Sequence, residues 1–183
     1  DHIIDGSTIY PKDYPYRSGI SAPLRDYQVS FADSVVKKFN LASKSLCVDI
    51  GSNDGTLLTG FKRNKMRVLG VEPTNMAKLA RKENKIKTIQ SFFTEKVANN
   101  IIKKYGLAKI VTMTNVFAHM ASLGEVMRGI NRLLDKNGIF IAQLMTLKPM
   151  IQKNDLGNIC HEHLEFYSYP SLVYLFEKNG LEI

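Results

Sequence analysis

The sequence predicts an α/β fold in which helices cover both faces of a mostly parallel sheet. Short apolar runs alternate along the chain with longer stretches whose apolar residues recur every three or four positions. Apolar runs of four to eight residues are typical of buried strands, and the wider spacing is typical of amphipathic helices. Strands and helices in strict alternation form a parallel sheet, and its carboxyl edge is where ligands bind.

The individual elements follow from this periodicity and from the residues that end each run. An amphipathic helix is predicted over residues 22–39, because apolar residues recur at helical spacing from Leu24 to Phe39. After it the pattern predicts a strand at 45–50, a helix at 54–64, a strand at 67–72, a helix at 73–83, a strand at 86–90, a helix at 93–105, a strand at 109–114, a helix at 123–134, a strand at 138–145 and a helix at 172–178. Pro73 suits the first turn of its helix, and Asn179-Gly180 ends the last one.

We expect one folded domain preceded by an arm. Residues 1–21 are rich in Tyr, Pro and Gly without a sustained period and indicate an arm or linker, whereas residues 22–183 suffice for one domain with a full core. The last residues, Leu181-Glu-Ile183, resemble the opening of a sixth strand. Because an incomplete sheet edge pairs with other chains, we expect a domain truncated at its C-terminal edge, with a flanking domain or a second copy as partner there.

Composition narrows the classes of partner. The 25 Lys and Arg residues outnumber 17 acidic residues, for a formal charge of +8, but they are scattered over successive predicted helices without interleaved aromatic residues. This pattern indicates solvated helix faces, and we expect no nucleic-acid partner. No apolar run approaches the roughly 20 residues of a membrane span, so we expect no membrane association and a cytoplasmic location. Two cysteines, Cys47 and Cys160, cannot build a disulfide framework or a four-cysteine zinc site.

The turn after the first predicted strand is a candidate ligand site. Gly51 and Gly55 allow the backbone to approach a ligand closely, and Ser52, Asn53 and Asp54 between them can cap the next helix. An ordinary strand-to-helix turn with the same cap residues is the alternative.

An acidic residue ends the second predicted strand. Glu72, followed by Pro73, lies about 20 residues beyond the turn, where a carboxylate accepts hydrogen bonds from ribose hydroxyls. The turn lacks the GxGxxG spacing that seats a pyrophosphate, and its acidic Asp49 and Asp54 favour a cationic ligand such as S-adenosylmethionine. Dinucleotide binding stays open as an alternative.

Histidines form a second candidate site. The segment Asn115-Val-Phe-Ala-His119 follows the fourth predicted strand, and Cys160-His-Glu-His-Leu-Glu-Phe-Tyr167 follows the fifth after a polar loop. Three of the four histidines are therefore expected at the carboxyl edge of the sheet, where imidazoles exchange protons at neutral pH. A backbone-satisfied histidine is the alternative for His119. A metal at His161 and His163 is another alternative, but a full ligand set is lacking, so we assign no metal.

These motifs resemble the sugar C-methyltransferases, class I S-adenosylmethionine enzymes with a Rossmann-like fold that act on nucleotide-linked 4-keto deoxysugars. The resemblance covers nearly the whole chain. It rests on Val48-Asp-Ile-Gly-Ser-Asn-Asp-Gly-Thr-Leu57, Leu69-Gly-Val-Glu-Pro73, Asn115-Val-Phe-Ala-His119 and His161-Glu-His-Leu-Glu-Phe-Tyr-Ser168, in the family's order, and on the arm Tyr14-Pro-Tyr-Arg-Ser-Gly19. Members usually add an N-terminal four-cysteine zinc module and a C-terminal domain, so the resemblance implies the central catalytic domain of a longer protein.

The resemblance also implies a reaction, in which a proton leaves the carbon beside a ketone and the resulting enolate attacks the methyl group of S-adenosylmethionine. His163 would be the base, His119 and Glu162 would orient the sugar or stabilise charge on the keto oxygen, and Tyr14 and Tyr16 would approach from the arm. The cofactor would contact Asp49, Gly51, Ser52, Asn53 and Gly55 through its methionine part, Glu72 and Pro73 through its ribose, and Asn115 on the side of the acceptor.

One position departs from the family pattern. The family commonly has tyrosine immediately before His-Glu-His, whereas this sequence has Cys160. A phenol that would hydrogen-bond the substrate is therefore missing, unless Tyr14, Tyr16 or Tyr167 reaches the same place. Two other functions stay open: an O- or N-methyltransferase of another small molecule, and a noncatalytic cofactor-binding module.

Overall fold

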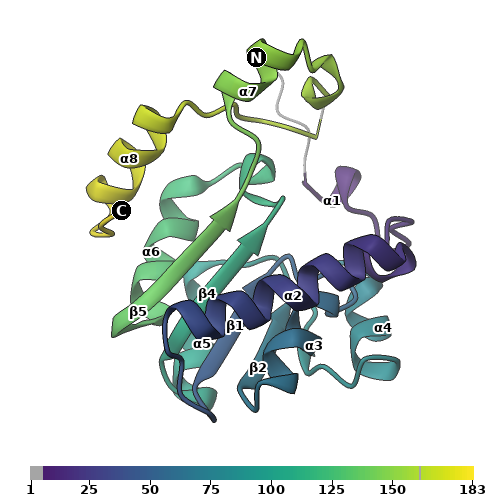
Figure 1. Ribbon diagram of the computed structural model, residues 1–183, viewed down its shortest axis with the longest axis vertical. Coiled ribbons are helices and arrows are strands. Elements are labelled where there is room, and N and C mark those ends of the chain that lie inside the picture. The colour runs from purple at the N-terminus through teal and green to yellow at the C-terminus, as the bar shows by residue number, and fades with distance from the viewer. Residues whose placement is uncertain (1–5, 161) are drawn as a thin grey trace.

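The computed structural model describes residues 6–160 and 162–183, and the described part contains a five-stranded parallel sheet (Figure 1). The strands are β1 (Leu46–Ile50), β2 (Arg67–Val71), β3 (Thr88–Ile89), β4 (Ala108–Thr114) and β5 (Leu134–Gln143). Their spatial order is β3-β2-β1-β4-β5, and every neighbouring pair is parallel. The chain order reverses at β1, which places the ends of β1 and β4 at the crevice where ligands bind in such sheets. The predicted fold class is confirmed.

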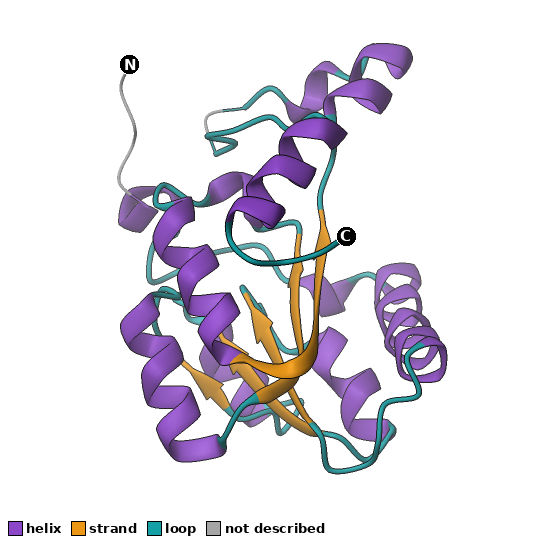
Figure 2. Ribbon diagram, turned by 90° about the vertical axis from the view of Figure 1, so that its left-hand side faces the viewer, coloured by secondary structure: helices purple, strands orange, loops and turns teal. Residues whose placement is uncertain are grey.

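Helices cover both faces of the sheet (Figure 2). Alternate residues of β1 face opposite layers, because successive side chains in a strand point to opposite sides. Val48 packs in a core with α5 (Glu95–Tyr105) and α6 (Leu123–Leu133), whereas Cys47 packs in a second core with α2 (Ala22–Lys38), α3 (Thr56–Arg63) and α4 (Met76–Lys82). Both faces of the strand are therefore buried, which explains why all its residues except Asp49 are apolar.

Cap residues set the starts of several helices two or three positions away from the predicted ones. Gly55 adopts a left-handed conformation, with φ of +79°, so α3 begins at Thr56. The Thr94 side chain accepts a hydrogen bond from the Val97 N–H (3.2 Å), and α5 starts after it. Ser168 and its partner three residues on form a capping box, so α8 (Tyr169–Lys178) begins earlier than residue 172.

The segments at the two ends of the chain contain elements that the sequence did not predict. The arm holds a short helix α1 (Gly6–Ile9) and a 3-10 turn η1 (Ser18–Ile20). Beyond the tips of β4 and β5 lies α7 (Leu147–Lys153), followed by the 3-10 turn η3 (Leu156–Asn158) (Figure 1). Another 3-10 turn, η2 (Phe117–His119), follows β4.

The sixth strand expected at residues 181–183 does not form. The Leu181 N–H donates to the Phe176 carbonyl (2.9 Å), and the Leu181 side chain packs against the core instead. Leu181, which was expected to start a strand, thus closes the end of α8. Among the described helices, none has the length and apolarity to cross a bilayer.

We predict that Phe61→Ala lowers the free energy of unfolding by about 3–5 kcal/mol, because the fully buried ring fills the layer between the sheet and α2. Urea denaturation with linear extrapolation measures the loss. Tyr174→Ala is the control, since this ring is 65% exposed, and its effect should stay within about 0.5 kcal/mol. Equal losses in the two variants would contradict the proposed packing.

Candidate active site

The turn after β1 requires glycine at two positions. Gly51 has φ of +70°, and a Cβ added there would collide with the Val116 side chain. Gly55 has φ of +79°, and its Cβ would lie 3.1 Å from Ile86. Between them the N–H groups of Gly51 and Ser52 both donate to the Val71 carbonyl, at 2.8 and 3.1 Å. The turn is therefore folded tightly back onto the end of β2.

Glu72 fixes this turn from the end of β2. Its buried carboxylate accepts hydrogen bonds from the Asn53 N–H (2.9 Å), the Thr74 N–H (3.0 Å) and the Thr74 hydroxyl (2.7 Å). A carboxylate offers about four acceptor positions, so one remains for a ligand hydroxyl. Glu72 also lines the cavity described below, as its predicted role requires.

Asp49 is the second acidic group at the edge of the sheet. Its side chain is buried, and one oxygen accepts a hydrogen bond from the Thr112 hydroxyl on β4 (2.7 Å). Burial, with a smaller contribution from the nearby Glu72, raises the pKa of Asp49 to about 7, while the Thr112 hydrogen bond opposes the shift. A cationic ligand beside Asp49 would favour the ionised carboxylate.

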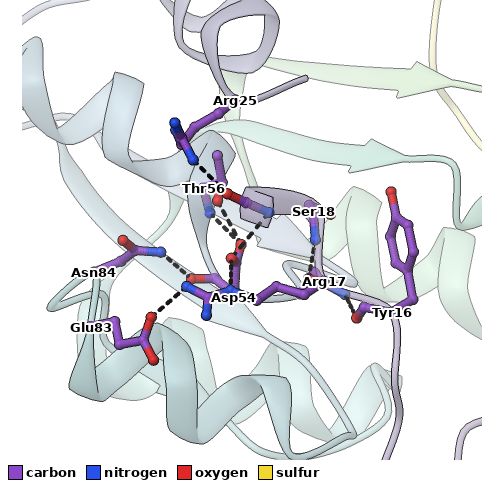
Figure 3. Close-up of polar contacts among 10 residues, drawn as sticks. Tyr16, Arg17, Ser18, Arg25, Asp54, Thr56, Glu83 and Asn84 are labelled. Atoms are coloured by element: carbon purple, nitrogen blue, oxygen red, sulfur yellow. Dashed lines mark hydrogen bonds and ion pairs between the residues drawn. The ribbon is translucent and has the colours of Figure 1, made fainter. Parts of the chain in front are cut away.

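Asp54 does not face a ligand, contrary to the sequence-based expectation. Its carboxylate is fully buried and pairs with Arg17 of the arm, from Nε to Oδ2 at 2.9 Å (Figure 3). The other oxygen accepts hydrogen bonds from the Thr56 N–H and hydroxyl at the start of α3. Arg17 also pairs with Glu83, which lies at the end of α4. Asp54 therefore contacts the start of α3, as predicted, but its charge is paired with Arg17 and not with a ligand.

Asn53 joins the same arm to the turn. Its side-chain oxygen accepts from the Ser18 N–H (2.9 Å), and its side-chain nitrogen donates to the Tyr16 carbonyl (3.2 Å). We call residues 10–19, held by Asn53 and Asp54, the tyrosine arm. Because the arm is tied to the turn itself, any ligand of the turn also meets the arm.

A cavity of about 410 Å³ opens where the turn, the tyrosine arm and the ends of β2 and β4 meet. Most of the predicted site residues line it, namely Tyr14, Tyr16, Asp49, Gly51, Ser52, Asn53, Glu72, Pro73, Asn115 and His119. Gly55, Glu162 and His163 do not. The cavity also includes residues that the sequence analysis did not select, among them Tyr10, Gln28, Phe93 and Glu125.

Three polar atoms show that the cavity is built for a polar ligand. Among the described residues, the buried side-chain atoms without a hydrogen-bond partner are the Tyr10 hydroxyl, the Gln28 Oε1 and the Ser52 Oγ, and all three residues line this cavity. Buried polar atoms are nearly always paired in folded proteins. A signal for Gln28 was present in the sequence, because it interrupts the apolar stripe of the first predicted helix.

The charges of the lining residues indicate the sign of the ligand. Among the described residues, the lining contains the acidic residues Asp49, Glu72 and Glu125 and neither Lys nor Arg, although the whole chain carries a formal charge of +8. Burying a phosphate there without a cationic partner would be costly. The cavity therefore suits a ligand with positive charge and uncharged polar groups.

Two histidines pack together at one side of the cavity, where His119 lines the cavity and His163 lies behind it. The Nδ1 of His119 lies 2.7 Å from the Glu162 carbonyl, and the Nδ1 of His163 lies 2.7 Å from the Asn158 carbonyl. Because a carbonyl only accepts, each Nδ1 carries a hydrogen, and in a neutral His119 ring the lone pair lies on Nε2. The two rings touch, with centroids 4.8 Å apart. Burial lowers the pKa of His119, so its ring is neutral at pH 7 and able to take up a proton.

The remaining predicted residues of the histidine loop are placed differently from the expectation. Glu162 meets His119 through its backbone carbonyl and not through its carboxylate. The Tyr167 hydroxyl donates to Glu165 and its ring packs on Phe117, so this phenol does not reach the cavity. His161 lies outside the described residues. Within the described ranges, no group of three or more potential metal ligands is gathered.

This sheet order, with an acidic cavity beyond β1, defines a Rossmann-like S-adenosylmethionine-dependent methyltransferase domain. Residues 24–183 match a family model described as a methyltransferase domain, and the chain belongs to that family.

Known relatives agree with this assignment. The C-methyltransferase NovU of Streptomyces niveus is 31% identical over 183 residues, which is all of this chain but 43% of the relative. An S-adenosylmethionine-dependent methyltransferase from Archaeoglobus fulgidus has a TM-score of 0.61 at 16% identity, over 83% of this chain and 68% of its own. The YcgJ protein of Bacillus subtilis gives 0.65 at 17% identity, over 84% and 68%.

The cavity fits S-adenosyl-L-methionine, the cofactor of this class. The unpaired Ser52 Oγ, the remaining acceptor position on Glu72 and the buried Asp49 carboxylate match a ligand with polar hydroxyls and a positive charge. The close packing of Gly51 against Val116 leaves no room for a side chain in the turn.

We predict that Arg17→Ala loosens the tyrosine arm and costs about 1–3 kcal/mol of stability, because the buried Asp54 carboxylate loses a charged hydrogen-bond donor. Chemical denaturation measures the loss, and limited proteolysis should show faster cleavage within residues 10–19. Arg63→Ala is the matched control, since its ion pair with Asp33 is exposed on both sides and is worth at most about 1 kcal/mol. If the two variants behaved alike, the arm would not depend on this pair.

We further predict that cofactor affinity rises with pH through about 7, because the cationic ligand binds best when Asp49 is ionised. Calorimetry at pH 7 in buffers of different ionisation enthalpy should then detect proton release on binding. The Asp49→Asn variant should bind the cofactor more weakly and without proton release. Asp33→Asn, at an exposed position, should leave the affinity and the proton release unchanged.

The same pKa shift also affects the free protein. The folded state holds the Asp49 proton more tightly than the unfolded chain does, so the free energy of unfolding falls as pH rises through about 7. Asp49→Asn should remove this fall. A flat dependence in the unchanged protein would contradict the raised pKa.

Proposed function

We propose that the protein catalyses C-methylation of a nucleotide-linked 4-keto deoxysugar by S-adenosylmethionine, through an enolate of the sugar. The observation that carries the proposal is the neutral His119 imidazole, whose lone pair lies on Nε2, on the wall of the cavity that also contains Asp49 and Glu72. Carbon alkylation through an enolate needs a group beside the methyl-donor site that takes the proton from carbon, and His119 is placed to be that group. The similarity to a C-methyltransferase supports the same choice.

The proton acceptor is one of the two touching imidazoles. The resemblance to the sugar C-methyltransferases implies His163, but only His119 lines the cavity, and this favours His119 as the group that takes the proton from carbon. His163 then packs against His119 and holds its orientation. A positioned histidine base contributes typically about 10² to 10⁴ in rate.

The other site residues bind and orient. When bound, S-adenosylmethionine supplies an electrophilic methyl group, and the electron pair of the broken carbon–sulfur bond stays on sulfur. Asp49 offers negative charge to the positive end of this ligand, and Glu72 accepts from its ribose hydroxyls. Asn115, Tyr14 and Tyr16 line the same cavity and bound the space in which the substrate would lie.

The charge of the cavity limits which part of the substrate enters it. In the described part of the chain, neither Lys nor Arg lines the cavity, so a diphosphate would lie unpaired beside Asp49 and Glu72. The sugar ring is uncharged and rich in hydroxyls and fits this environment. We therefore propose that the sugar enters and the nucleoside diphosphate stays outside.

We predict that His119→Gln lowers transfer of a labelled methyl group to a nucleotide-linked 4-keto deoxysugar by about 10²- to 10⁴-fold, because the base is lost. Cofactor affinity, measured by calorimetry, should change less than about threefold. His163→Gln should cost less, since its ring acts through His119.

Two outcomes would change the account. Loss of transfer in His163→Gln with activity kept in His119→Gln would return the base to His163. Methylation by the unchanged protein of a hydroxyl or amine, with none at carbon, would replace the proposed function by O- or N-methyl transfer.

A further inference from the structure

Tyr10 brings to the cavity a hydroxyl that no described protein group uses. Its oxygen is buried and has no hydrogen-bond partner among the described residues, and Tyr10 lines the same cavity as Asp49 and His119. Leaving a buried hydroxyl unpaired lowers stability, and Tyr side chains usually find a partner when buried. A hydroxyl that the described residues leave unpaired is available to donate a hydrogen bond to an acceptor atom of a ligand in this cavity.

The ring of Tyr10 stands beside the candidate base. Its centroid lies 5.6 Å from that of His119, with the rings at 84°, and 5.4 Å from that of Tyr14. The phenol and the imidazole thus share one end of the cavity. A substrate carbon that reaches the imidazole would bring its neighbouring oxygen near the phenol.

The backbone holds Tyr10 in this position without help from a ligand. The Tyr10 N–H donates to the Gly6 carbonyl (2.8 Å), which closes α1. Two residues further on, the Lys12 carbonyl accepts from the Asn75 N–H (3.2 Å), and the Asn75 side chain accepts from the Tyr14 N–H (3.0 Å). The arm on both sides of Tyr10 is therefore fastened, and a fixed donor needs no reorganisation during a reaction.

The surroundings keep the phenol protonated. Burial raises the pKa of Tyr10, and the nearby ionisable groups of Tyr14 and Glu162 raise it further. A phenol in this state donates a hydrogen bond throughout the working pH range and does not act as a base. Its natural partner is an oxygen on which negative charge develops.

We propose that Tyr10 is a catalytic residue, whose hydroxyl donates a hydrogen bond to the keto oxygen of the acceptor and stabilises the charge that develops there. This inference rests on the proposed enolate function. As the imidazole takes the proton, the electron pair of the carbon–hydrogen bond forms a carbon–carbon double bond, and the carbonyl π pair moves to the oxygen that Tyr10 contacts. The pair of the carbon–carbon double bond then forms the bond to the methyl group, and a pair on the oxygen re-forms the carbonyl. The electron pair of the broken carbon–sulfur bond leaves on sulfur.

The test compares Tyr10→Phe with the unchanged protein. The reaction followed by NMR is exchange of the hydrogen beside the ketone of a nucleotide-linked 4-keto deoxysugar in D₂O, with S-adenosylhomocysteine present so that no methyl group is transferred. Loss of one donor to a developing oxyanion should slow this exchange roughly 10²-fold. The Tm should stay the same or rise by about 2–4 °C, because an unpaired buried hydroxyl is removed. Tyr27→Phe, at a half-exposed site on α2, is the control and should change neither the exchange rate nor the Tm.

Three results overturn the proposal, and they differ in meaning. Exchange in Tyr10→Phe as fast as in the unchanged protein shows that the hydroxyl does not contact the keto oxygen. A lower Tm in Tyr10→Phe shows that the hydroxyl has a structural partner. If the unchanged protein gives neither exchange nor methyl transfer, the enolate function itself fails and Tyr10 loses its role with it.

Discussion

The turn after β1 is held from three directions, and the cavity depends on these contacts. Glu72 binds the turn from β2, Gly51 packs against Val116 beyond β4, and Asp54 ties the turn to Arg17 of the tyrosine arm. The buried pair of Asp54 and Arg17 brings an arm from the start of the chain over a site built by the sheet. The tyrosine arm therefore forms one wall of the cavity, and the turn to which it is tied forms another.

The charge of the cavity is opposite in sign to the net charge of the chain. The protein is basic, with a formal charge of +8, yet its cavity contains carboxylates and neither Lys nor Arg among the lining residues. The raised pKa of Asp49 reflects the cost of keeping such a group buried. A cationic ligand offsets this cost, which explains why the site favours a sulfonium cofactor over a dinucleotide with its two phosphates.

Local sequence signals were enough to predict the fold class, the tight turn at Gly51 and the place of Glu72 at the end of the next strand. Each depends on short-range periodicity or on the regular geometry of strand, helix and strand. The role of Asp54 was not predictable, because its partner Arg17 lies 37 residues away and enters through a segment without periodicity. The same reason explains why Tyr10 was missed and why α7 was taken for a loop. The sequence also could not show which histidine lines the cavity. His119 does and His163 does not, and this depends on how two loops meet in space.

The central claim is that an acidic cavity between the β1 turn and the tyrosine arm receives the methyl donor. A crystal structure with S-adenosylhomocysteine bound tests it most directly. The account predicts the ribose hydroxyls on the Glu72 carboxylate, the amino end beside Asp49, and the sulfur on the side of the cavity that faces His119. A ligand bound elsewhere, or one that enters only after the arm has separated from Asp54, would contradict it.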